Sequence, residues 1–473
     1  MLPAVALVGR PNVGKSTLFN RLTATRDALV ADYPGFTRDR RYGLGAAAER
    51  RFIVIDTGGL TAPANTDEMT ALVAKQVEIA IEEADTVVLV VDHRSGLTDD
   101  DVRVAERLRR VAKPVVIAVN KAEGVPGEIA EAEFHSLGLG APVGISATHG
   151  QGVEALMLAA LAPFPVDDDG ANAPAEAALE AERGPKVAVI GRPNVGKSTL
   201  INRLLGENRL ITSPEPGTTR DSVHVPCERD GKKFVLVDTA GIRRRARVAE
   251  GQVVEKYSVV QALKAIEDAG AVIAVLDARE SVTDQDMHLV GLAAERGRAL
   301  AVAVNKWDGL SGHERRLVER EVERKLDFAP YASVHYVSAL HGSGIAELVK
   351  AALVAHKNAG AEFATPRLTR VLEDAMEVNP PPLVRGRQVR LRYAHQGGRY
   401  PPLVVVHGTQ AQRLPDHYKR YLENSFREAL RLRGTPVRVE LRTTENPFAG
   451  RRNRLTPRQA KSRKRMLRFK HKK

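Results

Sequence analysis

"GRPNVGKSTL" occupies residues 9–18 of this chain, and the same ten letters return at residues 191–200. The first eight letters of each copy fit the pattern G-x-x-x-x-G-K-S, and each copy follows an apolar strand-like run and precedes a helix-like stretch. A glycine-rich loop in this setting turns its backbone N–H groups toward phosphate oxygens, and its lysine adds a positive charge. The sequence therefore predicts two phosphate-binding loops, built from Gly9, Asn12, Gly14 and Lys15 and from Gly191, Asn194, Gly196 and Lys197.

The repeat continues beyond this loop. "FTRD" at residues 36–39 matches "TTRD" at 218–221, and "DTGG" at 56–59 matches "DTAG" at 238–241, both with the same spacing of 182 residues. "NKAEG" and "NKWDG" begin at residues 120 and 305, and "ISATHGQG" and "VSALHGSG" begin at 145 and 337. We therefore expect two copies of one domain of roughly 165 residues, with insertions confined to the loops between motifs.

Apolar runs alternate with helix-like stretches in each copy. "VALVG", "FIVIDT", "TVVLVVD" and "PVVIAVN" have the length and β-branched content of strands buried on both faces. This pattern predicts an α/β fold with a doubly wound, mainly parallel sheet in each copy and ligands at the carboxyl ends of its strands. The predicted divisions are a first domain at 1–165, an acidic flexible linker at 166–185, a second domain at 186–358, a small α+β domain at 359–450 and a disordered basic tail at 451–473.

Hydroxyl and carboxylate groups at matching places predict a magnesium site beside each phosphate loop. The serine after the loop lysine supplies a hydroxyl, and the aspartate that ends a following strand is the natural partner for the ion through water. The glycine three residues after this aspartate can offer its N–H to the terminal phosphate. Lys15 and Lys197 would also stabilise charge in the transition state. The other predicted residues are Ser16, Asp56 and Gly59, and Ser198, Asp238 and Gly241.

The base is predicted from "NKWD" at residues 305–308 and "NKAE" at 120–123. A carboxylate in the last place accepts both N–H groups on the guanine edge, whereas adenine would leave it unpaired. Asp308 fits this role, but Glu123 is one methylene longer. Either Glu123 pairs through a shifted rotamer, or the first site binds guanine more weakly or less selectively. The predicted guanine-binding residues are Asn120, Lys121, Glu123, Ser146 and Ala147, and Asn305, Lys306, Asp308, Ser338 and Ala339.

Composition limits the class of protein. The 473 residues are 43% hydrophobic and 27% charged, as in soluble globular proteins. No window approaches the roughly 20 apolar residues of a membrane-spanning helix. Cys227 is the single cysteine, which excludes an internal disulfide and suits a reducing cytoplasm.

The net charge of +13 comes almost entirely from one end of the chain. Residues 451–473 contain 12 Lys or Arg and no acid, while the other residues hold 59 bases (71 minus 12) and 58 acids. Such a tail is typical of nucleic-acid contact, because each phosphate that it neutralises releases counterions. A solvated tail is the alternative, and charge alone does not distinguish RNA from an anionic membrane surface or nuclear targeting.

With these motifs, the sequence resembles translation-factor-type GTPases, and the tandem arrangement is similar to the Der family, also called EngA, of double GTPases in bacterial ribosome assembly. The resemblance covers roughly residues 1–450. It implies GTP and GDP as ligands, Mg²⁺ as a cofactor, hydrolysis of GTP to GDP and phosphate, and the large ribosomal subunit with its rRNA as a partner. It also implies that Thr37 and Thr219 are the switch-loop threonines that complete magnesium coordination.

One departure from many GTPases concerns catalysis. Where a glutamine often orients the attacking water, this chain has Leu60 and Ile242, which have no polar group for that task. The resemblance implies a potassium ion with Asn12 and Asn194 among its ligands; alternatively, these asparagines serve only the turn. "IRRRAR" at residues 242–247 either couples the nucleotide state to RNA or another domain, or forms a solvated face.

Residues 360–450 form a third unit. "RLTRVLEDAMEV" predicts a helix stopped by "NPPP", and "QVRLRYA" and "PLVVVHG" predict two strands. A second predicted helix follows and is ended by Gly434; one of its faces carries Tyr418, Tyr421, Leu422, Phe426, Ala429 and Leu430. "VRVEL" predicts a last strand. This α-β-β-α-β order resembles the KH-like domain of the Der family. The GxxG loop with which true KH domains clamp RNA is absent. We expect either direct RNA binding by this domain or packing against the GTPase copies, with "HQGGRY" at residues 395–400 and the tail contacting RNA.

Two separately readable nucleotide states, with no visible pocket for a second substrate, favour a GTP-binding and GTP-hydrolysing switch over a metabolic enzyme. With the destination that the family resemblance implies, we predict a monomeric, cytoplasmic protein that acts in assembly of the large (50S) ribosomal subunit, with nucleotide state controlling domain arrangement and ribosome or rRNA binding. One alternative is a GTPase of RNA modification, which would need an extra catalytic domain. Another is a nucleotide-stabilised RNA-binding scaffold in which hydrolysis is incidental.

Overall fold

The structure is a computed structural model that describes residues 2–23, 41–47, 50–57, 78–165, 183–207, 224–229, 231–237, 259–384 and 387–443. The chain divides into two compact units. The first contains Met1–Ala361, Gly398–Pro402 and Leu430–Val437, and the second contains Glu362–Gly397, Leu403–Ala429 and Arg438–Lys473. Most of the predicted linker, the whole predicted tail and the segment 242–247 lie outside the described residues.

The first copy of the repeat forms a six-stranded sheet in the order β2-β3-β1-β4-β5-β6. Only β2 runs antiparallel to its neighbour, β3. Every residue of β1 and β4 is buried, as expected for apolar strands covered on both faces. The strands are β1 (Ala4–Val8), β2 (Arg41–Ala47), β3 (Arg50–Asp56), β4 (Thr86–Asp92), β5 (Val115–Asn120) and β6 (Val143–Gly144).

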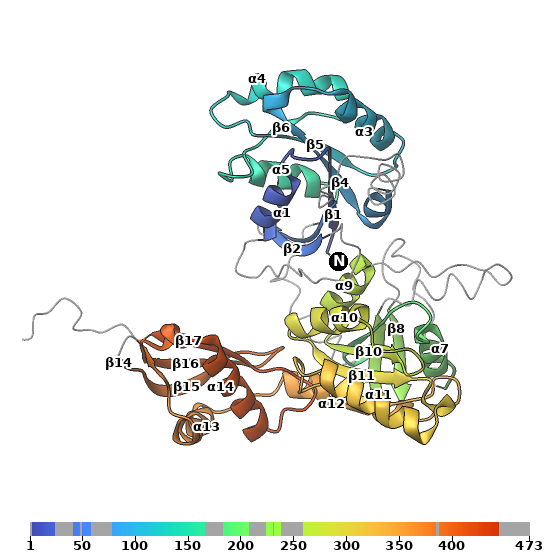
Figure 1. The fold of residues 1–473 in the computed structure, drawn as a ribbon, viewed down its shortest axis with the longest axis vertical. Helices are drawn as coiled ribbons and strands as arrows, with labels where there is room; N and C mark the ends of the chain where they lie inside the picture. The colour runs from blue at the N-terminus through green and yellow to red at the C-terminus, as the bar shows by residue number, and fades with distance from the viewer. Residues whose placement is uncertain are drawn as a thin grey trace, which may run out of the picture. The chain divides into compact units, whose positions relative to one another are not determined.

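Helices cover both faces of this sheet (Figure 1). Val5 and Leu7 of β1 join one core with α1 and α5, whereas Ala4, Ala6 and Val8 join another with α3 and η2. This alternation follows from the two-residue period of a strand. The helices are α1 (Lys15–Thr23), η1 (His93–Ser95), α3 (Asp99–Arg109), α4 (Gly127–Glu131), η2 (Ala132–Leu137) and α5 (Val153–Leu161).

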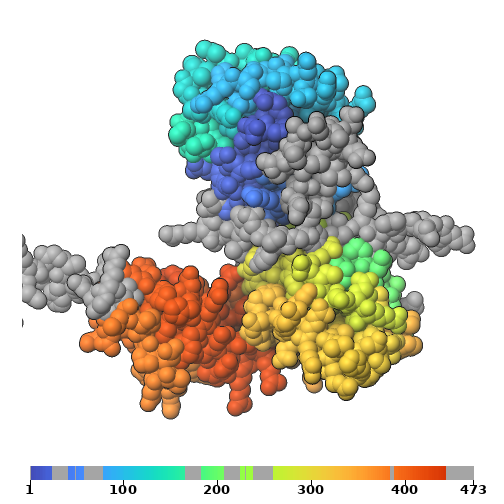
Figure 2. Space-filling model, in the orientation of Figure 1, coloured from blue at the N-terminus to red at the C-terminus, as the bar shows by residue number. Residues whose placement is uncertain are grey.

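Segments far apart in the sequence pack side by side in this first copy. β1 pairs directly with β4, with Val5 opposite Thr86 and Val8 opposite Leu89. Figure 2 shows the corresponding surface, where the dark blue start of the chain is continuous with the cyan to green residues of 78–165. The carboxyl ends of β1, β3, β4 and β5 therefore meet at one edge, where the predicted nucleotide motifs follow.

The second copy repeats the same sheet order, β8-β9-β7-β10-β11-β12, again with one antiparallel pair at the edge. α7 and α12 pack on one face, and α9, α10 and α11 on the other. The prediction of two doubly wound, mainly parallel sheets is confirmed. The elements are β7 (Lys186–Ile190), α7 (Lys197–Glu207), β8 (Val225–Arg229), β9 (Lys232–Val237), α9 (Val259–Asp268), β10 (Ala271–Asp277), α10 (Asp284–Glu295), β11 (Ala299–Asn305), η3 (Trp307–Gly309), α11 (Gly312–Lys325), β12 (Ser333–Tyr336) and α12 (Ile345–Ala359).

The second unit has a three-stranded sheet, β15-β16-β17, with β16 and β17 parallel. Its two long helices pack together and bury Leu372, Tyr418 and Leu422, and the Tyr418 hydroxyl donates to the Asn379 carbonyl at 2.8 Å. The predicted small α+β domain is confirmed. Its elements are α13 (Thr365–Val378), β13 (Leu383–Val384), β14 (Arg387–Gln388), β15 (Arg390–Gly398), β16 (Leu403–Thr409), η4 (Ala411–Arg413), α14 (Asp416–Ala429) and β17 (Arg438–Thr443).

Two details of this domain differ from the prediction. The second helix, α14, ends at Ala429 rather than continuing to Gly434, because Arg431 has a φ of 56°, a left-handed conformation that a right-handed helix does not accept. A short antiparallel pair, β13 and β14, was also not predicted. No helix in the described part of the chain is long and apolar enough to cross a bilayer.

Candidate nucleotide-binding sites

The backbone of each phosphate loop is shaped by two glycines. Gly9 has a φ of 151°, and a Cβ atom there would lie 2.3 Å from the Val90 carbonyl oxygen. Gly14 has a φ of 97°, and a Cβ atom would lie 2.2 Å from Nδ2 of Asn120. The loop therefore packs against the end of β4 and against the first residue of the NKAE motif, which only glycine permits. The corresponding glycines of the second copy, Gly191 and Gly196, have φ angles of 152° and 96°.

The predicted loop lysines lie at the first residues of α1 and α7. Nζ of Lys15 donates to the carbonyl oxygens of Gly9 at 2.8 Å and Arg10 at 2.7 Å. Burial lowers the pKa of Lys15 to about 8, although the Asp56 carboxylate acts in the opposite direction. Nζ of Lys197 likewise donates to the carbonyl oxygen of Arg192. Each amine is thus fixed inside its loop by the loop's own backbone.

Part of the predicted magnesium site lies in the described residues. Ser16 follows Lys15 on α1, and Asp56 ends β3 with 1% of its surface exposed. The neighbouring Thr57 hydroxyl donates to the Leu7 carbonyl at 2.7 Å, which joins the ends of β3 and β1. A hydroxyl and a buried carboxylate are the hard oxygen donors that Mg²⁺ prefers, so these residues fit the ion. Ser198 lies at the second residue of α7, whereas Thr37, Gly59, Thr219, Asp238 and Gly241 lie outside the described residues.

The asparagine of each base motif connects two loops. Nδ2 of Asn120 donates to the Val13 carbonyl at 2.8 Å, and its Oδ1 accepts from the N–H of Ala147 at 2.9 Å. Asn305 makes the same pair of bonds to Val195 and Ala339, at 2.8 and 2.9 Å. The structure therefore brings the predicted base residues Asn120, Ser146 and Ala147, and their counterparts in the second copy, next to the phosphate loops.

The lysine of each base motif also reaches the phosphate loop. Lys121 donates from Nζ to the Asn12 carbonyl at 3.0 Å and to Oδ2 of Asp92 at 2.6 Å. Lys306 makes the equivalent bonds to the Asn194 carbonyl, at 2.8 Å, and to Asp277. The predicted potassium ligands Asn12 and Asn194 lie in the loops that these lysines reach, and both residues are exposed.

Asp92 and Asp277 were missed from the sequence. Each is 4% exposed and ends the strand before η1 or α10. Burial acts to raise the pKa of Asp92, but hydrogen bonds from Lys121 and from the Arg94 N–H lower it. The signal that could have identified them is their matching place in the aligned "VVDHR" and "VLDAR" segments.

The carboxylates predicted to read guanine have an arginine and a histidine nearby in both copies, but each carboxylate pairs directly with a different one of the two. Glu123 accepts from Nη2 of Arg94, and a hydrogen bond with Ser146 lowers the pKa of this glutamate. Oδ2 of Asp308 lies 3.3 Å from Nε2 of His341, and a hydrogen bond with Ser338 lowers the pKa of this aspartate. Both carboxylates thus lie beside the predicted serine, and in the first copy an arginine also holds the longer glutamate.

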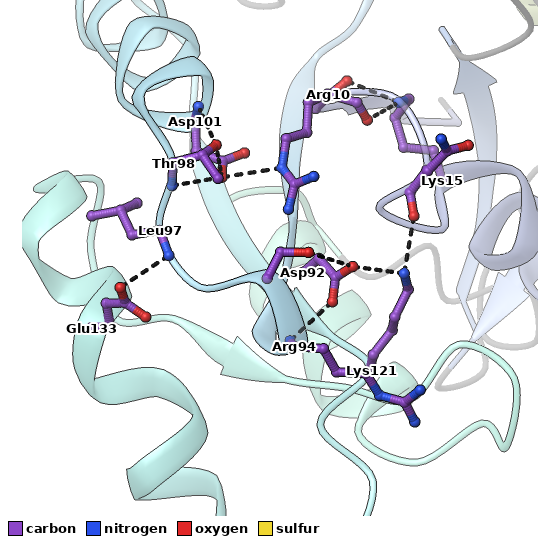
Figure 3. A network of polar contacts seen from close by, with 12 residues as sticks. Arg10, Lys15, Asp92, Arg94, Leu97, Thr98, Asp101, Lys121 and Glu133 are labelled. Atoms are coloured by element: carbon purple, nitrogen blue, oxygen red, sulfur yellow. Dashed lines mark hydrogen bonds and ion pairs between the residues drawn. The ribbon is translucent and has the colours of Figure 1, made fainter. Parts of the chain in front are cut away.

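A further polar network links the first phosphate loop to the start of α3 (Figure 3). Nε of Arg10 donates to Oδ2 of Asp101 at 3.3 Å, and the same oxygen accepts from the N–H and hydroxyl of Thr98. The second copy has the equivalent contact between Arg192 and Asp286 at 2.7 Å. Neither aspartate was predicted as a site residue, because each reads as an ordinary acid in the first turn of a helix.

Two known families match this chain. The family described as "50S ribosome-binding GTPase" matches residues 4–121 and 186–306, the two copies of the repeat. The family described as "KH-domain-like of EngA bacterial GTPase enzymes, C-terminal" matches residues 363–442.

Curated relatives are similar along the whole chain. The GTPase Der of Thioalkalivibrio sulfidiphilus is 53% identical and covers 100% of both chains. The GTPase Der of Methylococcus capsulatus is 51% identical over 99% of both chains, and that of Hahella chejuensis is 50% identical over 99% of this chain and 97% of its own. Since the repeated loops, the two matching sheets and relatives of full length agree, this chain belongs to the Der family of GTPases.

Proposed function

We propose that this GTPase is a two-site switch in assembly of the large (50S) ribosomal subunit, in which the state of the bound nucleotides controls domain arrangement and binding to the ribosome or its rRNA. The observation that carries the proposal is the duplication of one bonding pattern, in which an asparagine and a lysine of the base motif both reach the phosphate loop. The match to a family described as ribosome-binding supports the destination.

In this proposal the residues divide by the part of the nucleotide that they contact. The loop glycines and Lys15 and Lys197 bind phosphate and offset the charge that develops during transfer. Asn120, Lys121, Glu123, Ser146 and Ala147 form the first guanine pocket, and Asn305, Lys306, Asp308, Ser338 and Ala339 form the second.

Magnesium is held in the proposal by the hydroxyl of Ser16 or Ser198 and, through water, by Asp56 or Asp238, with Thr37 or Thr219 completing the set. When bound, the ion neutralises charge on the phosphate oxygens. The burial of Asp56 beside Lys15 supports this assignment, because the site then combines a fixed cation with a fixed carboxylate. The domain divisions at residues 165, 185, 358 and 450, a monomeric state and a cytoplasmic location are also part of the proposal.

Potassium dependence follows from the proposed ligands Asn12 and Asn194. A monovalent cation beside the bridging phosphate oxygen would offset developing charge in sites where Leu60 and Ile242 have no polar group to orient the attacking water. GTP turnover is therefore expected to be faster in KCl than in NaCl at equal ionic strength. The N12A/N194A double variant is expected to lose this difference, each single variant is expected to lose the share of its own site, and equal wild-type rates in the two salts would contradict the assignment.

The test of the switch is co-sedimentation of the purified full chain with ribosomal subunits. Pelleting with the large subunit is compared with a non-hydrolysable GTP analogue, with GDP and without nucleotide. Binding only with the analogue supports the switch, provided that the K15A/K197A double variant no longer responds. Equal binding in all three conditions would overturn the switch and favour a nucleotide-stabilised scaffold.

A further inference from the structure

We propose that Asp101 and Asp286 are positioning residues, which hold each phosphate loop in its binding shape through the arginine at the second place of that loop. The inference deepens the proposed function and rests on it, because it takes the two loops to be nucleotide sites. Neither aspartate belongs to the base or magnesium motifs of the proposed nucleotide pocket. Each acts on the loop lysine through one intermediate residue.

The first step is the burial of the two carboxylates. The Asp101 and Asp286 side chains are 0% and 1% exposed, and the paired Arg10 and Arg192 side chains are 19% and 14% exposed. A buried carboxylate is costly unless it is paired with a cation and hydrogen-bonded. The same arginine–aspartate pair occurs in both copies, between residues that are 91 and 94 positions apart. Its recurrence in two domains indicates a requirement of the loop rather than an accident of one helix.

The second step is the link from arginine to lysine. The carbonyl oxygen of Arg10 accepts from Nζ of Lys15, and that of Arg192 accepts from Nζ of Lys197. A displaced arginine would therefore move the acceptor that aims the amine. Asn12 and Asn194, two residues after the arginines, have φ angles of 65° and 64°. Asparagine tolerates this left-handed region better than other non-glycine residues, but the conformation still carries a cost, and the arginine–aspartate contact helps to keep the loop in it.

Each aspartate also caps the helix in whose first turn it lies, and this capping must be distinguished from its contact with the loop arginine. Oδ2 of Asp286 accepts from the N–H and hydroxyl of Thr283 at 3.0 and 2.8 Å and so completes the capping box of α10. The other oxygen, Oδ1, accepts from Nε of Arg192 at 2.7 Å. Because the two tasks use different oxygens in this copy, an asparagine can keep the cap and lose the charge that holds the arginine.

The second copy also provides a control within the same arginine. Nη2 of Arg192 donates to Oε2 of Glu280 at 3.0 Å, but the Glu280 side chain is 57% exposed. Exposed ion pairs contribute little, whereas charge-assisted bonds to buried groups contribute substantially. Loss of Glu280 is therefore expected to leave the loop almost unchanged, in contrast to loss of Asp286. In the first copy Ser95 stands at the place that matches Glu280, and Nε of Arg10 donates to Asp101 at 3.3 Å.

The experiment measures GDP affinity by titration calorimetry in the full-length K15A chain, so that only the second site is read. D286N and R192A are each expected to weaken GDP binding by about tenfold. Because both act through one contact, the D286N/R192A double variant is expected to bind no more weakly than R192A alone. E280A and T283A are expected to stay within about twofold of the parent, although T283A lowers the melting temperature through its lost cap.

Three outcomes would overturn the inference. They are unchanged affinity in R192A, additive losses in the double variant, and a D286N effect that T283A reproduces at an equal loss of melting temperature. If D286N fails to fold, R192A still decides, because it removes nothing from the capping box. If the K15A chain binds no GDP at all, the nucleotide assignment of the second site fails and the inference fails with it. If the K15A chain binds GDP and none of these variants changes the affinity, the inference is refuted while the nucleotide assignment stands.

Discussion

The charge of one buried amine, that of Lys15, is expected to decide how strongly the first phosphate loop binds an anion. Lys15 is 6% exposed, and its pKa is lowered to about 8 by burial, with the nearby Arg10 charge adding to the effect and Asp56 opposing it. Near neutral pH the amine is mostly charged, which favours an anion such as the phosphate of the proposed ligand. Above its pKa the site loses the charge on which this attraction depends.

We expect GDP binding at the first site to weaken as the pH rises through about 8. Bound phosphate favours the charged amine, so the complex keeps a proton that the free site releases above its own pKa. The dissociation constant then rises toward about tenfold per pH unit until the pKa of the complex is reached. Calorimetry on the K197A chain measures this rise. K15R, which stays charged, is the control for titration of guanine itself, and an equal rise in K15R would contradict the prediction.

Replacement of Glu123 tests the base assignment at the same scale. E123A in the K197A chain is expected to weaken GDP binding by about ten- to a hundredfold, because two charge-assisted hydrogen bonds to the guanine edge are removed. D308A in the K15A chain is the matched variant of the second site. Unchanged GDP affinity in E123A, with the expected loss in D308A, would show that the first site does not read guanine through this glutamate.

At the residue scale, the sequence predicted the groups that belong to local motifs and missed those defined by long-range contacts. Asn120 and Lys121 follow a strand in a recognisable pattern. Asp92 acquires its role only in the fold, where it pairs with Lys121, 29 residues away. Asp101 reaches Arg10 across 91 residues. Such partners are visible in a sequence only when the two copies are aligned and their shared acids are compared.

At the scale of elements, the helices that flank each sheet carry much of its core. α12 places Leu348 and Ala352 in the core formed with α7, β10 and β11, and both residues are at most 1% exposed. Because α7 begins at the end of the second phosphate loop and β11 ends at the base motif, this shared core holds the two loops at a fixed distance from each other. Stability of α12 and nucleotide binding are therefore connected through β11, which ends at Asn305.

L348A is expected to lower the free energy of unfolding of the second GTPase domain by about 2–5 kcal/mol, through the cavity left at a fully buried position. Trp307 is the only tryptophan in the sequence, and the centroid of its ring lies 4.2 Å from that of Tyr336, so its fluorescence in urea reports on this domain. V354A, on the 40% exposed side of the same helix, is expected to cost less than about 1 kcal/mol. Equal shifts in the two variants would contradict the packing argument.

Strands were predictable where an apolar run is continuous, as in β4 and β10, because burial on both faces leaves polar residues only at the ends of the strand. The end of α14 was not predictable, since Arg431 adopts a positive φ without being glycine. β13 and β14 have two residues each, which is too short for any alternation to be read. Local composition thus predicts long elements well, while tertiary contacts decide where the short ones begin and end.

At the scale of the whole molecule, the number and order of the domains follow from the repeat, but the distribution of contacts does not. Residues 398–402 and 430–437 cluster with the first unit, although they interrupt the sequence of the small α+β domain. Within that first unit, Gly434 accepts from the Leu300 N–H at 2.7 Å and donates to the Tyr331 carbonyl at 2.8 Å. No local pattern predicts a bond between residues more than a hundred positions apart.

Charge is also distributed at this scale, with an almost neutral body and a basic end at residues 451–473. A chain that stops at residue 450 is expected to bind single-stranded RNA more weakly and with a smaller salt slope, by about 0.7 for each phosphate that the tail no longer neutralises. Filter binding across a series of KCl concentrations measures both quantities. A full-length chain with glutamine at the 12 basic positions is the control for length. Unchanged affinity and slope would show that the tail is only solvated.

The side-chain amides of Asn120 and Asn305 each join two loops, so the two halves of each proposed site are expected to bind their ligand cooperatively. One planar group bonds to the phosphate loop on one side and to the base loop on the other, so ordering one loop also removes the entropy of the other. A fragment such as pyrophosphate would then raise the affinity for guanosine within the same pocket, without touching it. The intact nucleotide carries both parts in one molecule. Its binding free energy is therefore expected to be more favourable than the sum of those of guanosine and pyrophosphate measured separately.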